Sequence, residues 1–576
     1  MEKNTSHISH IPRQAANLNA LIDSSCASYA KHNALGMALE TPISYQELHD
    51  RIHVLAARLQ QEGVRFGDRV ALLAENSHNW GTVYFAAVRL GAVCVPILPD
   101  LPKDDVQNIL TEMECRVIFT SKQQLSKLVD SDQDLDQEIA LLVTFDDYQE
   151  AGRAGQNKVL PFTEFLSEAK AEFTNVLKNG SLQFPEVASD HPASILYTSG
   201  TSGFSKAVVL THANLCSNAA AAAGAITIEP GAVFLSVLPV AHTYKFTVGL
   251  LMPLLKGACV LYTNKTPTPA VLKKLCAHER PHVMLIVPLI IEKIYTKQVI
   301  PAVLKSRLLT FLCRFPFGRK WVYQKIGNKL ADFFGGRLKM LAIGGAALNP
   351  DVEDFLWDSG LPFLVGYGMT EAAPLISGGP EEDRTIQPGS AGKPVAGVEV
   401  RIDHPDPITD IGEILARGPN VMQGYWNNPE ETAKTIDEQG WLHTGDLGYF
   451  DEQGNLHIKG RSKSVIVLAN GENVYPEGIE HKLDSSPLVA DSLVVERNGV
   501  LEALVHPDYD FIDKQMQGKS KEEQQAFIAA ELERIRQLVN MRTGSISYLT
   551  KIVEQKEPFV KTATHKIKRY LYAEES

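Results

Sequence analysis

The chain has 576 residues, of which 44% are hydrophobic, so it is long enough for two or more domains with large cores. It carries 56 Lys and Arg against 68 Asp and Glu, a net charge of −12, which argues against a protein that coats nucleic acid along its length. The 7 Cys are scattered without a CxxC pair or a Cys/His cluster, which excludes the usual metal-site patterns and fits a reducing cytosol.

The beginning of the sequence, residues 1–21, has no continuous apolar core, so we expect no secretory signal there. The most hydrophobic region, residues 233–263, is interrupted by His242, Lys245 and Lys256, and we therefore expect no membrane span. These features predict a cytoplasmic protein.

Short β-branched runs alternate with helical spacing between residues 69 and 368. Residues 69–75 and 92–98 are predicted strands with a helix between them. Further predicted strands are residues 233–239, 258–263, 282–288, 338–345 and 362–368. Strands that alternate with helices favour parallel α/β sheets, which bind ligands at the carboxyl ends of their strands.

A loop rich in hydroxyl groups and glycine interrupts this pattern, and a cation follows it at Lys206. Its residues are Thr198, Ser199, Gly200, Thr201, Ser202 and Gly203. Successive backbone N–H groups and hydroxyls in a tight turn suit phosphate oxygens, and a lysine adds a point charge. The alternative is a flexible surface loop. It is not a Walker loop, because Phe204 stands where that motif requires lysine.

The basic segment of residues 297–329 contains no acid and interleaves Leu309, Phe311, Phe315 and Trp321 with its charges. One interpretation is a solvated helical face in an insertion. The other is weak, salt-sensitive peripheral contact with the cytoplasmic face of an anionic membrane, if the segment is amphipathic.

The texture changes at Gly397 to shorter strands and turns, with predicted strands at residues 397–403 and 412–418 and a hairpin turn at 451–455. After Arg461 a small α+β unit is expected, with a polar helix near residues 519–539. We place the boundary there. The predicted domains are a large N-terminal domain, 1–461, and a small C-terminal domain, 462–576.

The string from Ile195 to Leu215 resembles the phosphate loop of the adenylate-forming superfamily, which comprises acyl-CoA synthetases, adenylation domains of peptide synthetases and beetle luciferases. Segments that resemble further family motifs, in the family's order, are residues 366–374, 440–463, 470–480 and 560–569. The resemblance spans nearly the whole chain. It implies an α/β fold. The large N-terminal domain, 1–461, would bind ATP and the acyl group and would have parallel-type α/β subdomains plus a β-rich subdomain. The small C-terminal α+β domain, 462–576, would be a lid that carries the catalytic lysine.

The resemblance implies that ATP transfers AMP to a carboxylic acid, which gives the acid a good leaving group. Residues 198–203 and Lys206 would hold the triphosphate, Thr370 would contact the α-phosphate, and Glu371 would bind magnesium, which prefers oxygen ligands. The structural alternative for Glu371 is a solvated helix-cap residue.

The resemblance also implies an adenosine site. Tyr367, with Gly368 and Met369, would meet the adenine ring, and Asp446 and Arg461 would bind the ribose hydroxyls. The backbone that lines the adenine and acyl pocket would be Gly344, Gly345 and Ala346. The structural alternatives are core packing for Tyr367, an ion pair at a turn for Asp446 and Arg461, and an ordinary glycine turn for the remainder.

Three further residues carry family roles by resemblance. Lys566 would bridge the carboxylate and the phosphate, Lys463 would be the hinge of the lid domain, and His242 would adjoin the acyl carboxylate. The alternatives are solvated lysines and a satisfied core histidine. The sequence departs from the family pattern at Ala207, Ser205 and His565.

The strings at residues 287–295 and 467–476 resemble bacterial long-chain fatty acyl-CoA ligases. The implied reaction joins a medium- or long-chain fatty acid, through acyl-AMP, to coenzyme A. An acid that would hold an α-amino group is missing near His242, which disfavours amino-acid substrates. The open alternatives are an acyl carrier protein as acceptor, an acyl-AMP ligase, a luciferase-like monooxygenase and a non-catalytic binding relative.

Overall fold

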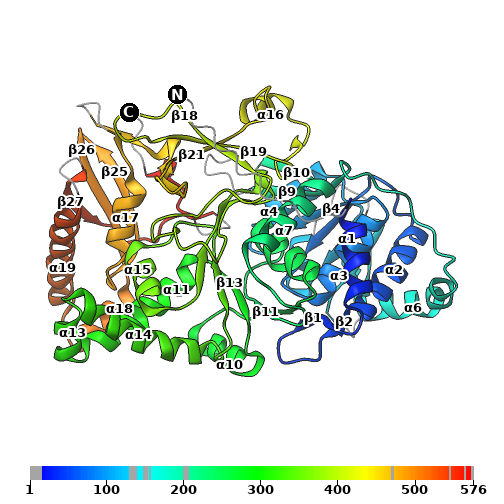
Figure 1. The fold of residues 1–576 in the computed structure, drawn as a ribbon, viewed down its shortest axis with the longest axis horizontal. Helices are drawn as coiled ribbons and strands as arrows, with labels where there is room; N and C mark the ends of the chain where they lie inside the picture. Colours follow the sequence, from blue (N-terminus) through cyan, green and yellow to red (C-terminus); the bar gives the residue numbers. More distant parts are fainter. Residues whose placement is uncertain are drawn as a thin grey trace.

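The computed structural model describes residues 16–128, 139–146, 153–154, 157–198, 206–468, 473–543, 547–562 and 566–572. Figure 1 shows two neighbouring α/β lobes built on large sheets, a β-rich part above them, and a C-terminal α+β unit at the left. No helix among the described residues has the length and apolar character needed to cross a bilayer.

The first lobe contains a nine-stranded sheet with parallel pairs at its centre and an antiparallel edge. Its strands, in spatial order, are β20 (Gly424–Tyr425), β10 (Lys206–Thr211), β9 (Pro192–Thr198), β4 (Val93–Ile97), β3 (Arg69–Leu73), β5 (Val117–Thr120), β6 (Leu141–Thr144), β8 (Asn157–Pro161) and β7 (Arg153–Ala154). Its helices include α1 (Leu18–Ser28), α2 (Tyr45–Gln61), α3 (His78–Arg89), α4 (Lys103–Glu112), α5 (Leu125–Leu128) and α6 (Phe162–Lys178).

The second lobe contains a seven-stranded sheet. Its strands, in spatial order, are β15 (Phe363–Val365), β14 (Met340–Ile343), β13 (Val283–Ile286), β11 (Val233–Ser236), β12 (Cys259–Tyr262), β1 (Asn33–Met37) and β2 (Ile43–Ser44). Its helical segments include α7 (His212–Ala225), α8 (Thr243–Phe246), η2 (Thr247–Leu251), α9 (Met252–Leu255), α10 (Pro269–Glu279), α11 (Pro288–Ile294), η3 (Tyr295–Val299), α12 (Ile300–Leu304), α13 (Arg307–Leu312), α14 (Pro316–Phe333) and α15 (Pro350–Ser359). The predicted parallel α/β architecture is confirmed.

One continuous hydrophobic core joins the two sheets. Helix α3 contacts β3 and β4 of one sheet and β1 of the other, and its Trp80, Tyr84 and Phe85 are fully buried. Helix α7 is alanine-rich and buried on nearly all sides, because small side chains let the neighbouring elements approach. Thr211 and Asn214 form a capping box at its start, so the helix begins directly after β10.

The β-rich part follows a short hairpin of β16 (Tyr367–Gly368) and β17 (Leu375–Ser377). It is an antiparallel sheet of β18 (Glu399–Asp403), β19 (Gly412–Arg417), β21 (Leu442–Phe450) and β22 (Leu456–Arg461). Asp451 and Asn455 close the predicted hairpin turn between β21 and β22 with backbone bonds. Gly454 has a φ of +80°, which glycine adopts without strain.

The C-terminal unit has hydrophobic cores of its own, formed by residues from Ile466 onward. Its elements are η5 (Ser462–Ser464), β23 (Ile466–Val467), β24 (Asn473–Val474), α17 (Pro476–Asp484), β25 (Val489–Arg497), β26 (Val500–Pro507), α18 (Tyr509–Gln515), α19 (Lys521–Arg542), β27 (Leu549–Glu554) and η7 (Arg569–Leu571). Helix α19 is the predicted polar helix. The separate cores agree with the expected division at Arg461, which stays a prediction.

Candidate active site

The side chains expected to bind adenosine meet where β16, β21 and β22 come together. The Tyr367 hydroxyl donates to Asp446 Oδ2 at 2.8 Å, and Arg461 Nε lies 3.2 Å from Asp446 Oδ1. Antiparallel pairing sets Asp446 directly opposite Arg461. Gly368 is required here, because a Cβ would lie 2.0 Å from the Pro374 carbonyl oxygen. Residues far apart in the sequence therefore form one polar site.

Asp446 is a buried carboxylate whose charge is partly compensated. Burial raises its pKa above the ordinary value, and the charge of Arg461, the Tyr367 hydroxyl and the charge of Lys566 oppose that rise. Burial also raises the pKa of Tyr367, so its hydroxyl stays protonated and available as a donor. The site offers acidic oxygens that can accept hydrogen bonds from a diol.

Glu371 lies on η4 (Thr370–Ala372) and is buried. The Tyr425 hydroxyl donates to Glu371 Oε1 at 3.0 Å. Burial raises the pKa of Glu371, while the Tyr425 hydrogen bond and the charges of Lys206 and Arg461 lower it. Beside it, the Thr243 hydroxyl donates to Thr370 Oγ1 at 3.5 Å. Glu371 thus presents a buried carboxylate that the charges of Lys206 and Arg461 stabilise in its ionised form.

Lys206 begins β10, at the end of the predicted phosphate loop. Its ammonium donates to Glu431 Oε1 of α16 (Pro429–Thr435) at 2.6 Å and lies 4.7 Å from the Tyr425 ring centroid. Residues 199–203, named above as phosphate-loop candidates, lie outside the described residues, as does His565. The ammonium group of Lys206 therefore lies next to Tyr425, the residue that donates a hydrogen bond to Glu371.

His242, from the middle of the sequence, and Lys566, from near its C-terminal end, influence each other electrostatically. His242 caps α8, and its Nδ1 accepts the Tyr244 backbone N–H at 3.3 Å, which leaves Nε2 as the protonated nitrogen. Desolvation and the charge of Lys566 lower the pKa of His242 to about 4, so the ring is neutral at neutral pH. It can donate a hydrogen bond to an anion without adding charge.

Lys566 lies next to an isolated β-bridge between Lys561 and Ile567. Its backbone N–H donates to the Thr562 hydroxyl at 3.2 Å. Desolvation and the charge of Arg461 lower its pKa, and Asp446 and Glu371 raise it, even though the residue is exposed overall. Three of the predicted site residues, Arg461, Asp446 and Glu371, therefore act on one ammonium group. The expected role of Lys566, a bridge between the substrate carboxylate and the phosphate, stays a prediction.

A small apolar cavity of about 20 Å³ includes Tyr244, two residues from His242. Its lining residues are Ala222, Ala225, Ile226, Tyr244, Val248, Ala342, Ile343, Leu364, Gly366, Leu375 and Gly378. None of these carries a charge. Gly344 borders the cavity, since a Cβ there would lie 3.1 Å from the Tyr244 ring. Gly345 and Ala346 follow it and are exposed.

Two buried asparagines that the sequence analysis missed hold the Glu371 segment. Asn218 of α7 accepts from Leu375 N at 3.0 Å and donates to the Leu375 carbonyl at 2.8 Å. Asn420 donates to the Ala372 carbonyl at 2.9 Å. In the sequence, each is only a polar residue beside apolar ones. That pattern cannot reveal a distant partner such as Leu375, which lies 157 residues from Asn218.

We expect Asn218→Ala to destabilise the protein by about 1–3 kcal/mol, because it leaves the buried Leu375 N–H without its acceptor, while the Leu375 carbonyl keeps Asn420 as a donor. Urea unfolding followed by intrinsic fluorescence measures the loss. Ser217→Ala, on the same helix with one short-range bond to Asn214, is the matched control and should change the midpoint less. Equal midpoints for both variants would contradict the assigned role of Asn218.

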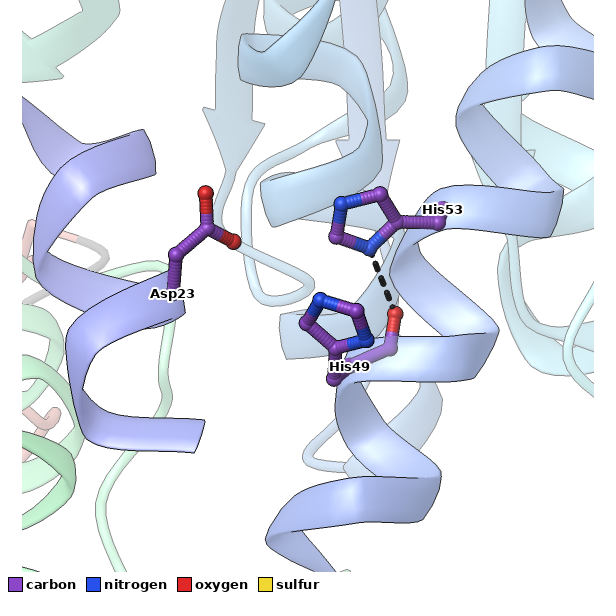
Figure 2. Close-up of side chains that lie close together, drawn as sticks. All are labelled: Asp23, His49 and His53. Atoms are coloured by element: carbon purple, nitrogen blue, oxygen red, sulfur yellow. Dashed lines mark hydrogen bonds between the residues drawn. The ribbon is translucent and has the colours of Figure 1, made fainter. Parts of the chain in front are cut away.

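A second cluster of polar side chains lies on α1 and α2 (Figure 2), which are well separated from β21 in Figure 1. Asp23, His49 and His53 have possible ligand atoms within 4.8 Å of one another. However, Arg89 donates to the Asp23 carboxylate, and His53 Nδ1 donates to the His49 carbonyl at 2.8 Å. The cluster is internally balanced, and we assign it no metal.

The model of one protein family, described as AMP-binding enzyme, matches residues 22–426. A peroxisomal long chain acyl-CoA synthetase 6 of Arabidopsis thaliana is 31% identical and covers 82% of this chain and 69% of its own length. The 4-coumarate–CoA ligase 3 of the same plant is 29% identical over 79% and 75%.

Among solved structures, ATP-bound MatB of Rhodopseudomonas palustris aligns with a TM-score of 0.73 at 24% identity, over 96% of this chain and 98% of its own. That likeness supports the fold. The family match covers most of the chain and includes β9, β10, η4 and Tyr425. The chain therefore belongs to the AMP-binding enzyme family, and its relatives include acid–CoA ligases.

Proposed function

We propose that this enzyme activates a medium- or long-chain fatty acid to acyl-AMP and then transfers the acyl group to coenzyme A. The observation that supports a fatty acid is the uncharged lining of the small cavity that includes Tyr244, two residues from His242. Uncharged walls favour an apolar chain, and the cavity must widen to admit one, since about 20 Å³ holds about one water. One relative is named as a long chain acyl-CoA synthetase and the other as a 4-coumarate–CoA ligase. The choice of a fatty acid over an aromatic acid therefore needs its own test.

In the first step, a carboxylate oxygen of the substrate attacks the α-phosphorus of ATP. A new C–O–P linkage forms and the bond to the pyrophosphate oxygen breaks. Negative charge is concentrated on both reactants, so donors fixed in advance lower the barrier. The neutral His242 would orient the carboxylate, and Lys566 would reduce the repulsion between the carboxylate and the phosphate.

The remaining side chains would hold the nucleotide. Asp446 would accept hydrogen bonds from the ribose hydroxyls, while Tyr367 and Arg461 hold the Asp446 carboxylate in place. Lys206 would exchange Glu431 for phosphate oxygens, which is a replacement of one anion by another. Thr370 would donate its hydroxyl to the α-phosphate.

The donor set fits a hard divalent cation such as magnesium. Glu371 supplies a carboxylate oxygen, and its partner Tyr425 uses Oε1 only. Bound magnesium supplies neutralisation of phosphate charge. The protein's own contribution is to hold that carboxylate at the position set by Asn218 and Asn420.

In the second step, a thiolate attacks the acyl carbonyl carbon, the C–O bond to AMP breaks, and AMP leaves. Lys566 has no role in that step and must leave room for the thiol. The exposed Lys463 on η5 follows β22 directly and precedes the first residue of the separate C-terminal core, which suits a hinge. Coenzyme A is the proposed thiol; an acyl carrier protein is the alternative acceptor.

We expect Lys463→Pro to slow thioester formation at least tenfold more than adenylation, because proline fixes φ near −65° and restricts rotation at the hinge. Single-turnover assays of each half-reaction measure the two rates. Lys463→Ala keeps the backbone free and should affect both steps little. If proline slows the two steps equally, Lys463 is not the hinge.

The test of the proposed function is ATP-dependent AMP release across saturated fatty acids of increasing chain length, with 4-coumarate as an aromatic competitor. Each acid is assayed with coenzyme A and with acyl carrier protein. We expect the highest kcat/KM for a fatty acid with coenzyme A. A preference for 4-coumarate would exclude the fatty acid assignment. Turnover with acyl carrier protein but not with coenzyme A would show that the carrier protein is the acceptor.

A further inference from the structure

The helices between β13 and β14 carry an exposed apolar surface. Its large side chains, which belong to α12, α13 and the start of α14, are Leu304, Leu308, Phe311, Phe315, Phe317 and Trp321. Phe317 is 91% exposed, Leu308 66% and Leu304 63%. Helices α12 and α13 contain no buried residue at all. Side chains of this size are rarely grouped on a surface without a partner.

The same helices are strongly basic. The basic residues between Lys297 and Lys329 are Lys305, Arg307, Arg314, Arg319, Lys320 and Lys325. Within the described residues, Arg319 is neutralised by Asp358 at 2.9 Å, whereas Arg307, Arg314 and Lys320 have no acidic partner. Lys325 lies 3.9 Å from the Trp321 ring centroid. The local charge is positive although the whole chain carries −12.

The geometry differs in one respect from a single amphipathic helix. Two short helices, α12 and α13, and the 18-residue α14 pack in sequence, and the Phe311 and Phe315 ring centroids are 5.4 Å apart. Leu309, expected on the surface, is half-buried, and Phe317 is the most exposed instead. Figure 1 shows α13 and α14 along the lower edge of the molecule. The apolar groups therefore project from a compact, protruding unit.

The surface is connected to the proposed acyl cavity through the sheet. The segment leaves β13 and returns as β14, and Ala342 and Ile343 of β14 line the cavity. Helix α14 packs on α15, the helix that follows β14. The exposed unit is thus an extension of the lobe that contains the cavity.

We propose that residues 300–329, which we call the basic apolar surface, dock the protein onto an anionic phospholipid bilayer. Phe317, Leu308 and Leu304 enter the interface, and the unpaired Lys and Arg contact lipid phosphates. A nucleic acid would satisfy the charges but leave the apolar groups exposed. A second copy would oppose like charges. An anionic bilayer satisfies both kinds of side chain.

The docking proposal goes beyond the activation reaction and does not depend on its substrate. Repulsion from the acidic remainder of the protein keeps the association weak and sensitive to salt, since at about 1 M ionic strength charges are screened beyond roughly 3 Å. Binding to vesicles is measured directly, without an activity assay, so a failure of the proposed reaction and a failure of docking can be told apart.

The test is co-sedimentation with vesicles of phosphatidylglycerol and phosphatidylcholine at low and high salt. We expect the wild type to bind at low salt, with at least tenfold weaker binding in high salt or to pure phosphatidylcholine. The variant R307E/R314E/K320E should lose at least tenfold, and L308S/F317S should lose a similar factor while keeping its salt dependence.

The matched control reverses the same number of charges on the first lobe, at the exposed residues Lys31, Arg65 and Lys178. The variant K31E/R65E/K178E should bind within about threefold of the wild type, since these charges lie away from the proposed surface. AMP release with a water-soluble acid verifies that each variant is folded. Equal loss in both triple variants, or a wild type that ignores anionic vesicles, would overturn the proposal. So would a dimer in sedimentation velocity that the L308S/F317S variant abolishes.

Discussion

Replacement of Lys566 by alanine should reduce ATP–pyrophosphate exchange at least a hundredfold, which corresponds to about 3 kcal/mol of transition-state stabilisation. The ammonium group of Lys566 is the cation on which Arg461, Asp446 and Glu371 all act. Its charge also acts on His242. Removing it leaves the carboxylate and the phosphate to repel each other during attack.

The same variant should retain most of its thioester formation when acyl-adenylate is supplied, because that step has no use for Lys566. Lys568→Ala, two residues later on the same segment, is the matched control and should leave exchange within about threefold of the wild type. Lys566→Arg tests whether charge alone is sufficient. Normal exchange by Lys566→Ala would remove the residue from the mechanism.

The second large effect is expected for Glu371→Gln. Glutamine keeps the size of the side chain and an oxygen that accepts from Tyr425, but it removes the negative charge. We expect adenylation to fall about a hundredfold and the magnesium concentration for half-maximal rate to rise. A magnesium titration of ATP–pyrophosphate exchange measures both quantities.

Tyr425→Phe is the graded control for this prediction. It removes one hydrogen bond to the carboxylate and should cost about tenfold in rate, with a smaller change in the magnesium requirement. The urea midpoints of both variants show whether the Glu371 segment keeps its fold. If Glu371→Gln adenylates normally at low magnesium, the carboxylate is structural.

Much of the local architecture could be predicted from the sequence, because it depends on short-range patterns. The run at residues 69–75 predicts β3, residues 338–345 predict β14, and the polar helix near 519–539 is α19. β-Branched runs between helical stretches report their own conformation, since side-chain periodicity follows backbone geometry. The family resemblance added which residues would share a site.

The resemblance could not supply the contacts that hold those residues. The sequence does not show that Asn218 and Asn420 hold the η4 segment, that Tyr425 bonds to Glu371, or that Lys206 rests on Glu431. Each of these depends on the approach of elements distant in sequence. The basic apolar surface was visible as charge and aromatic residues, but its most exposed member, Phe317, was not.

The sequence alone determined which chemical groups the protein has: the acids, the lysines and the hydroxyl- and glycine-rich loop. It also determined the order in which they occur along the chain. The tertiary structure decided which of them meet and in what state. Burial raises the pKa of Asp446 and Glu371, and desolvation with the charge of Lys566 lowers that of His242. Those shifts arise from the exclusion of water and from charges brought close by packing, and neither quantity is written in a linear order of residues.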